Sequence, residues 1–269
     1  MWLLLACTRD AETDFPPLPG IYDVEVTLTP DPPMAGEGAD VRYQILRDGE
    51  PVQDLQVAHE RLVHVFVIRG DLETFEHQHH EDYATITADD LRAATFHFPE
   101  TFSASGPFVL AFEWASENRY HTDRADVLVG GDVPQLDQPV SVLTDLATSG
   151  DVTAHLRWDT DPVVGQESAF SVVLEDSAGP VTDVVQWLGA DAHLAIASLD
   201  LTQVSHTHAW VADMENAAPS HAMPHLYPGP ELPFRFTFPT SGTYKVWAQF
   251  ARASAPETPY TMQFIVAIP

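Results

Sequence analysis

The stretch His64-Val-Phe-Val-Ile-Arg-Gly-Asp-Leu-Glu-Thr-Phe-Glu-His-Gln-His79 occurs a second time, as His193-Leu-Ala-Ile-Ala-Ser-Leu-Asp-Leu-Thr-Gln-Val-Ser-His-Thr-His208. In both copies an Asp-Leu pair follows the first histidine by 7 and 8 residues, and two more histidines follow it by 13 and 15. Five matching positions at one spacing indicate duplication rather than chance. The stretch therefore divides the chain into two repeats, each with a cluster of three histidines.

Short alternating apolar runs rich in Val, Thr and Phe surround each copy, which is typical of β-strands. About seven such runs in roughly 110 residues is the pattern of an immunoglobulin-like sandwich. The sequence therefore predicts an all-β protein of two tandem immunoglobulin-like β-sandwich domains, with one short helical turn at 89–94. The expected strands lie at 22–28, 39–46, 95–98, 107–114 and 125–129 in the first repeat, and at 152–158, 168–174, 236–238, 242–250 and 260–267 in the second.

We expect the two domains at 21–131 and 150–269, joined by a linker at 132–149. Residues 1–20 are predicted to be a truncated lipoprotein leader and a flexible tether, because their prolines and mixed charges cannot form a core element. Leu4-Leu5-Ala6-Cys7 resembles the lipobox of bacterial lipoproteins, where the cysteine carries the lipid. This predicts a cell-envelope location, in the periplasm or at the cell surface, with membrane contact only through a lipid on Cys7.

The net charge and the cysteine content limit which partners and which metal ligands are expected. The 269 residues carry a formal net charge of −28 and a single cysteine. An acidic surface repels nucleic acid and attracts cations, so no nucleic-acid partner is expected. One cysteine excludes an intramolecular disulfide framework and any multi-cysteine zinc site. Metal ligands would therefore come from histidine, carboxylate and methionine side chains.

The repeated stretch is expected to form a hairpin that turns at Gly70-Asp71. That register places His64 opposite His77, and His79 shares the same face by the two-residue period of a strand. Because Phe75 also lies on this face, the histidines are predicted to point into the apolar interior of the sandwich, at the hairpin end away from the turn. Three imidazoles could then converge on one ion at about 2.0–2.1 Å.

Loops at that end of each hairpin carry further donors. Imidazole suits zinc, copper and nickel, whereas a thioether selects Cu(I). Copper, as Cu(I) or Cu(II), is therefore the expected metal, with zinc as the alternative. The candidate metal ligands are His59, His64, His77, His79, His193, His206, His208, His221, Met223 and His225.

The motif His59-Glu60-Arg61-Leu62-Val63-His64, followed by Asp71-Leu72-x-x-Phe75-x-His77-x-His79, resembles a set of exported bacterial β-domain proteins. Their pattern runs His-Glu-x-x-x-His, Asp-Leu-x-x-Phe-x-His-x-His-Pro, then Phe-Pro and Gly-x-Tyr. The resemblance covers both repeats and implies an immunoglobulin-like fold and heavy-metal handling, chiefly of copper, in the cell envelope. The chain departs from the pattern where His80 and Ala209 replace the proline, and where Leu188-Gly189 replaces the upstream His-Glu.

These observations favour a non-enzymatic envelope protein that buffers or carries metal ions, one cluster per repeat, together with a metal-transport or copper-enzyme partner protein. Two alternatives stay open. Histidines that merely fill a core would make the chain a structural or interaction module of tandem domains. A three-histidine zinc site with an open position, with Glu60 or Glu81 as the base, would make it a hydrolase. We predict no catalytic residue.

Overall fold

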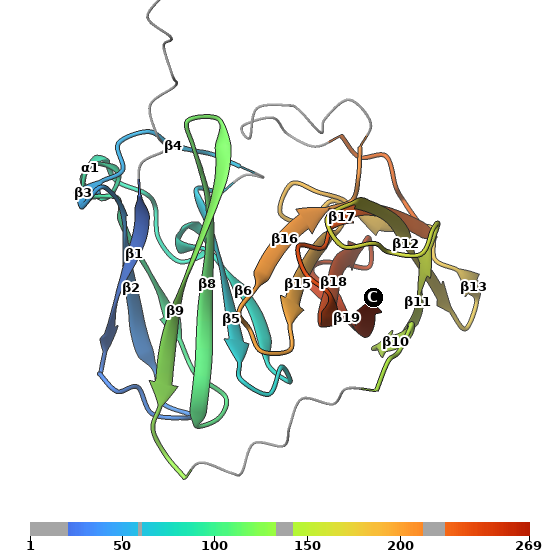
Figure 1. Ribbon diagram of the computed structural model, residues 1–269, viewed down its shortest axis with the longest axis horizontal. Coiled ribbons are helices and arrows are strands. Elements are labelled where there is room, and N and C mark those ends of the chain that lie inside the picture. The colour runs from blue at the N-terminus through green and yellow to red at the C-terminus, as the bar shows by residue number, and fades with distance from the viewer. Residues whose placement is uncertain (1–20, 59–60, 133–141, 212–223) are drawn as a thin grey trace, which may run out of the picture.

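The computed structural model describes residues 21–58, 61–132, 142–211 and 224–269 (Figure 1). The prediction of an all-β chain with two tandem immunoglobulin-like sandwiches is confirmed. The first repeat contains β1 (Tyr22–Thr29), β2 (Ala39–Arg47), β3 (Glu50–Pro51), β4 (Leu55–Gln56), β5 (Val63–Arg69), β6 (Phe75–Gln78), the 3-10 turn η1 (His80–Asp82), α1 (Ala88–Ala93), β7 (Thr95–Glu100), β8 (Gly106–Ser116) and β9 (Arg119–Val129).

The second repeat follows the same plan with an additional first strand. It contains β10 (Leu146–Ser149), β11 (Val152–Trp158), β12 (Glu167–Asp176), β13 (Gly179–Pro180), β14 (Val184–Val185), β15 (His193–Ser198), β16 (Val204–His208), β17 (Glu231–Thr237), β18 (Gly242–Arg252) and β19 (Ala255–Ile268). Strand β10 lies inside the stretch predicted as linker, where it pairs with β11. The only helix longer than one turn among the described residues, α1, is far too short to cross a membrane.

Each repeat consists of two antiparallel sheets packed face to face. In the first repeat one sheet has the order β1-β2-β3 with β7 on β2, and the other has β4-β8-β5-β6 with β9 on β8. In the second repeat the corresponding sheets are β10-β11-β12-β13 with β17 on β12, and β14-β18-β15-β16 with β19 on β18. Alternation builds the cores: Val41, Tyr43 and Ile45 of β2 pack against Val65 and Val67 of β5.

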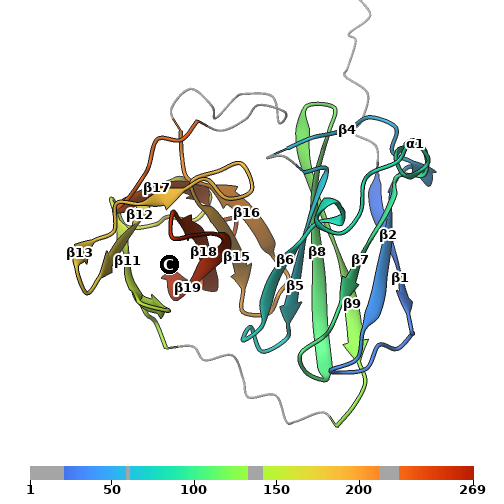
Figure 2. The same cartoon turned by 180° about the vertical axis from the view of Figure 1, so that it is seen from behind.

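The two sandwiches also pack against each other, through the outer faces of the sheets that carry the repeated hairpins. Figures 1 and 2 show β5 and β6 of the first repeat facing β15 and β16 of the second. A third apolar cluster fills this interface, with Phe66 and Ile68 from one side and Ala195 and Trp247 from the other. Strand β5 is therefore buried on both faces, which explains its continuous apolar sequence.

Both turns of the repeated hairpins use the Asp-Leu pair. The backbone of Leu72 has φ 63° and that of Leu201 has φ 55°, in the left-handed region. The preceding aspartates accept the backbone N–H two residues on, from Glu73 at 3.1 Å and from Thr202 at 3.1 Å. Both leucine side chains are buried in the apolar cluster between the repeats. The Asp-Leu pair thus shapes the turn and anchors it to the neighbouring domain.

Candidate metal centre

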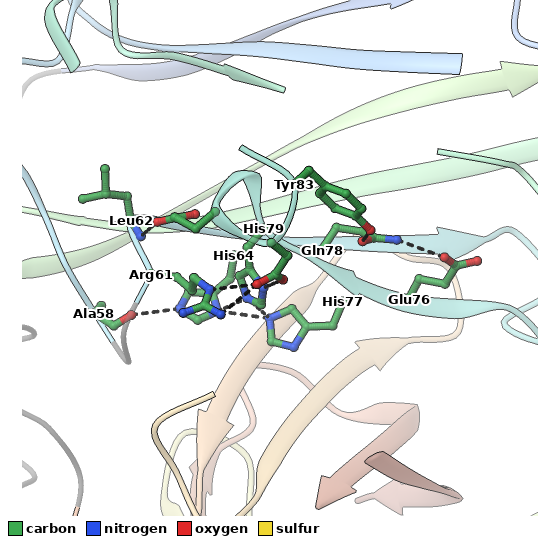
Figure 3. A network of polar contacts seen from close by, with 11 residues as sticks. Ala58, Arg61, Leu62, His64, Glu76, His77, Gln78, His79 and Tyr83 are labelled. Carbon is green, nitrogen blue, oxygen red and sulfur yellow. Dashed lines mark hydrogen bonds and ion pairs between the residues drawn. The ribbon is translucent and has the colours of Figure 1, made fainter. Parts of the chain in front are cut away.

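The first hairpin brings three ring nitrogens into contact (Figure 3). His64 Nδ1 lies 3.0 Å from His77 Nε2 and 3.0 Å from His79 Nε2, and the last two lie 3.1 Å apart. A triangle with these sides has its corners about 1.75 Å from its centre, so an ion at about 2.0–2.1 Å from each nitrogen sits about 1 Å out of the plane. The triad can therefore hold one ion.

The second hairpin repeats this arrangement in a looser form. His193 Nδ1 lies 3.1 Å from His206 Nε2. The ring of His208 is centred 4.7 Å from that of His193 and 4.3 Å from that of His206. One ligand nitrogen from each of the three lies within 4.8 Å of the others. We call His64, His77 and His79 the first triad, and His193, His206 and His208 the second triad.

Hydrogen bonds outside the first triad fix which nitrogens carry protons. His64 Nε2 donates to the carbonyl of Ala58 at 3.1 Å, and His79 Nδ1 donates to the Asp82 carboxylate at 2.8 Å. In a neutral imidazole the other nitrogen then carries a lone pair. Two lone pairs thus face each other at 3.0 Å. His77 Nε2, at 3.0 and 3.1 Å from them, either donates its proton to these lone pairs or joins them as the third ligand of a metal ion.

The second triad has the same pattern of outer hydrogen bonds. His193 Nε2 donates to the carbonyl of Trp187 at 2.8 Å, six residues before it, as Ala58 is before His64. His206 Nδ1 lies 3.2 Å from Oε1 of Glu113, a buried glutamate of the first repeat. The lone pairs of His193 Nδ1 and His206 Nε2 again converge. Each triad therefore has one histidine held by a carbonyl and one held by a carboxylate.

Burial keeps two members of the first triad, His77 and His79, neutral. It is the main cause that lowers the pKa of His77 well below its usual value, and the neighbouring histidines, His79 and His64 first, lower it further. Burial also lowers the pKa of His79, although the hydrogen bond that His79 donates to Asp82 acts in the opposite direction. Neutral imidazole is the form that binds a metal, so the site is already in its binding form at neutral pH.

We expect the metal-free protein to lose stability as the pH falls below about 6.5, the ordinary histidine value. The unfolded chain then takes up protons that folded His77 resists, so the free energy of unfolding falls with pH. Urea unfolding midpoints measured from pH 8 to pH 5 test this. The His155→Ala variant, which removes a partly exposed histidine, keeps the same pH dependence, whereas His77→Ala weakens it; equal slopes for all three proteins contradict the account.

The structure corrects the predicted register of the hairpin. Phe66, not His64, lies opposite His77, and in the second repeat His193 lies opposite His208. The reason is the turn, which runs from Arg69 to Thr74 rather than tightly about Gly70-Asp71. The three histidines still share one face because the shift is two residues, one full period of a strand.

The predicted direction of the histidines is also corrected. They are buried, but they face the interface between the repeats rather than the interior of their own sandwich. His64 lies on the face of β5 that carries Phe66, whose ring is centred 4.5 Å from that of His77. The opposite face of β5, with Val65, is the one that joins the sandwich core.

The remaining predicted ligands do not join either triad in the described residues. His225 Nδ1 lies 2.5 Å from Asp191, and this histidine is exposed at 44% of its side chain. His59, His221 and Met223 lie outside the described residues. The suggested base Glu81 accepts the N–H of Leu62 at 2.7 Å, and Glu60 is outside the described residues.

Glu113 was missed by the sequence reasoning, although a signal existed. It is a lone charge in the apolar run Phe108-Val-Leu-Ala-Phe-Glu-Trp114, and a charge in a buried strand needs a partner. The carbonyls of Ala58 and Trp187 were also missed, because a backbone acceptor has no sequence signal beyond its spacing.

A family model described as "Domain of unknown function (DUF8832)" matches residues 20–131 and again residues 147–268. No curated protein matches the sequence. Among solved structures, the chain is similar to red sea bream transglutaminase (9% identity, TM-score 0.25), latent PorU from Porphyromonas gingivalis (10%, 0.28) and the Escherichia coli adhesin FdeC (14%, 0.25). The alignments cover 91%, 92% and 93% of this chain and 31%, 20% and 66% of those chains.

Proposed function

The chain belongs to the family described as "Domain of unknown function (DUF8832)" in both of its repeats, and we propose that it is a metal-binding protein of the cell envelope that buffers or carries copper. One observation carries this proposal. In each triad, hydrogen bonds to a carbonyl and a carboxylate leave ring lone pairs converging at 3.0–3.1 Å inside a buried site. A metal ion bound to these lone pairs would join the three rings of each triad.

A purely structural role for the histidines is less well supported. Buried histidines that serve only packing pair each donor with an acceptor. Here His64 and His79 donate their protons to outer partners, their lone pairs meet at 3.0 Å, and His77 Nδ1 is buried with no hydrogen-bond partner among the described residues. Histidine ligands of metals show the same outward hydrogen bonds to carbonyl and carboxylate groups, which orient the ring and raise its basicity.

Copper is favoured by the chemistry of the donors. All six triad ligands are imidazoles, which suit copper and zinc alike. For a given nitrogen site, affinity among divalent ions peaks at Cu²⁺. The resemblance to exported copper-handling proteins points the same way, and the lipobox-like Leu4-Leu5-Ala6-Cys7 supports an envelope location with a lipid anchor.

A carrier fits the site better than a hydrolase does. The carboxylate of Asp82 is held by His79 at 2.8 Å and by Arg61 at 2.7 Å, so it orients a ligand and is poorly placed to act as a base. Both triads lie at a buried interface, where an ion is shielded from water. The ions would be passed to a metal-transport or copper-enzyme partner protein.

The proposal is tested by titrating metal-free protein with Cu(I), Cu(II) and Zn(II) under a competing chelator. We expect two ions per chain, with copper displacing zinc. Uptake of none of the three metals against the chelator would contradict the proposal. Metal-dependent hydrolysis of an ester or phosphate would replace it with the zinc-enzyme alternative.

Asp82→Asn is expected to weaken the first triad by about 10–100-fold, the usual cost of losing a partner that orients a metal-bound histidine. The amide still accepts a hydrogen bond but no longer polarises His79. The affinity is measured by chelator competition. Asp89→Asn is the matched control, because Asp89 is an exposed carboxylate nearby in α1 that pairs only with Arg92 among the described contacts. Equal affinity in both variants contradicts the role of Asp82.

A further inference from the structure

The two triads lie against each other. The ring of His206 is centred 5.2 Å from that of His64 and 5.4 Å from that of His77, and His193 lies 5.7 Å from His77. Within the first triad the ring centres are 4.4–5.2 Å apart. The spacing between repeats is therefore nearly the same as the spacing within one triad.

One hydrogen bond crosses the interface between the repeats, beside the two triads. Glu113 sits opposite His64 in the β5–β8 pair, yet its carboxylate reaches His206 of the other repeat. The equivalent position in the second repeat is Gln249, opposite His193 in the β15–β18 pair. The second triad thus receives an outer carboxylate from the first domain only when the two domains are docked.

In the part of the chain that the structure describes, the first triad has no equivalent of the hydrogen bond between Glu113 and His206. His77 Nδ1 and Gln249 Oε1 are both buried and have no hydrogen-bond partner among the described residues. By the duplication, they occupy the places of His206 and Glu113. The duplicated positions therefore differ in charge, with a glutamate serving the second triad and a glutamine at the matching position.

Building on the proposed metal-binding function, we propose that the six histidines form one binuclear centre, closed by the interface between the repeats and holding a pair of copper ions. An ion bound to a ring nitrogen lies about 3.2 Å from the ring centre. With 5.4 Å between the centres of His77 and His206, the two ions are at most about 12 Å apart. Glu113 acts in this centre as a positioning residue that ties the second ion to domain docking.

Electron paramagnetic resonance of the full chain loaded with two equivalents of Cu(II) tests the pairing. We expect dipolar broadening of the Cu(II) spectrum from two ions within about 12 Å of each other. His79→Ala and His208→Ala each leave one ion and a sharp, uncoupled spectrum, with circular dichroism checking that both variants fold. Two bound ions with the summed spectra of isolated sites overturn the binuclear centre and leave the proposed function intact. No bound copper overturns the proposed function itself.

Glu113→Gln tests the link across the interface. In the His79→Ala background, where only the second triad binds, we expect the affinity for Cu(II) to fall about 10–100-fold and the copper spectrum to change. In the His208→Ala background the same substitution leaves the first triad unchanged. Glu117→Gln is the control, because Glu117 is an exposed glutamate of the same hairpin paired with Arg47. An unchanged second-triad spectrum and affinity overturn the positioning role.

Discussion

His77→Ala and His206→Ala are each expected to reduce bound copper from two ions to one per chain, and the double variant is expected to bind none tightly. His77 Nε2 lies 3.0 Å from one ligand nitrogen and 3.1 Å from the other, so its loss leaves two ligands for an ion that had three. The loss of copper affinity should be larger than the loss of about 10–100-fold that follows removal of a residue hydrogen-bonded to a ligand histidine. Metal analysis after dialysis against a chelator measures it.

His155→Ala provides the control for both variants. His155 is a partly exposed histidine of β11 whose described ionic contact is with Glu175, and its loss should leave two ions bound. Loss of both ions from either single variant would contradict two separate triads, since it would mean that the two ions depend on a shared set of ligands.

Trp247→Ala is expected to lower the free energy of unfolding by about 3–5 kcal/mol, the usual cost of removing a fully buried large aromatic ring. Trp247 is completely buried between the repeats and stacks on Phe75 with 4.8 Å between ring centres. Each sandwich keeps its own core, so the variant should loosen docking before it unfolds either domain. Calorimetry should show a lower transition that splits into two, because domains that are no longer coupled unfold separately.

The control for this change is Leu128→Ala, in which a side chain that is 68% exposed is shortened. A surface change of this kind stays within about 0.5 kcal/mol of the original protein. Because Glu113 reaches His206 across the same interface, Trp247→Ala should also weaken copper binding by the second triad. A variant as stable as the Leu128→Ala control would contradict the packed interface.

The grouping of the histidines could be predicted from the sequence because it depends on local geometry. A two-residue period places His77 and His79 on one face whatever the register, and the hairpin brings His64 to the same end. The turn itself was harder to predict. A leucine with positive φ is rare, so Gly70 looked like the better centre, while burial of Leu72 against the other domain decided the outcome.

The docking of the two repeats could not be predicted from one sequence. The uninterrupted apolar run of β5 does indicate burial of both faces, but it does not say what covers the second one. Because the docking of the second repeat was not predicted, the histidines were placed in the interior of their own sandwich rather than at the interface between the repeats. Glu113 illustrates the same limit, since its isolation in an apolar strand predicts a buried partner, and only the assembled fold identifies His206.

X-ray absorption at the copper edge, on the 269-residue chain loaded with two ions, tests the central claim most directly. A net charge of −28 offers many surface carboxylates, so ion counting alone does not locate the metal. We predict a nitrogen shell at about 2.0 Å with the multiple-scattering pattern of three imidazoles per copper. An oxygen-dominated shell with fewer than one imidazole per copper would contradict the account, because the ions would then sit on surface carboxylates and the triads would be empty.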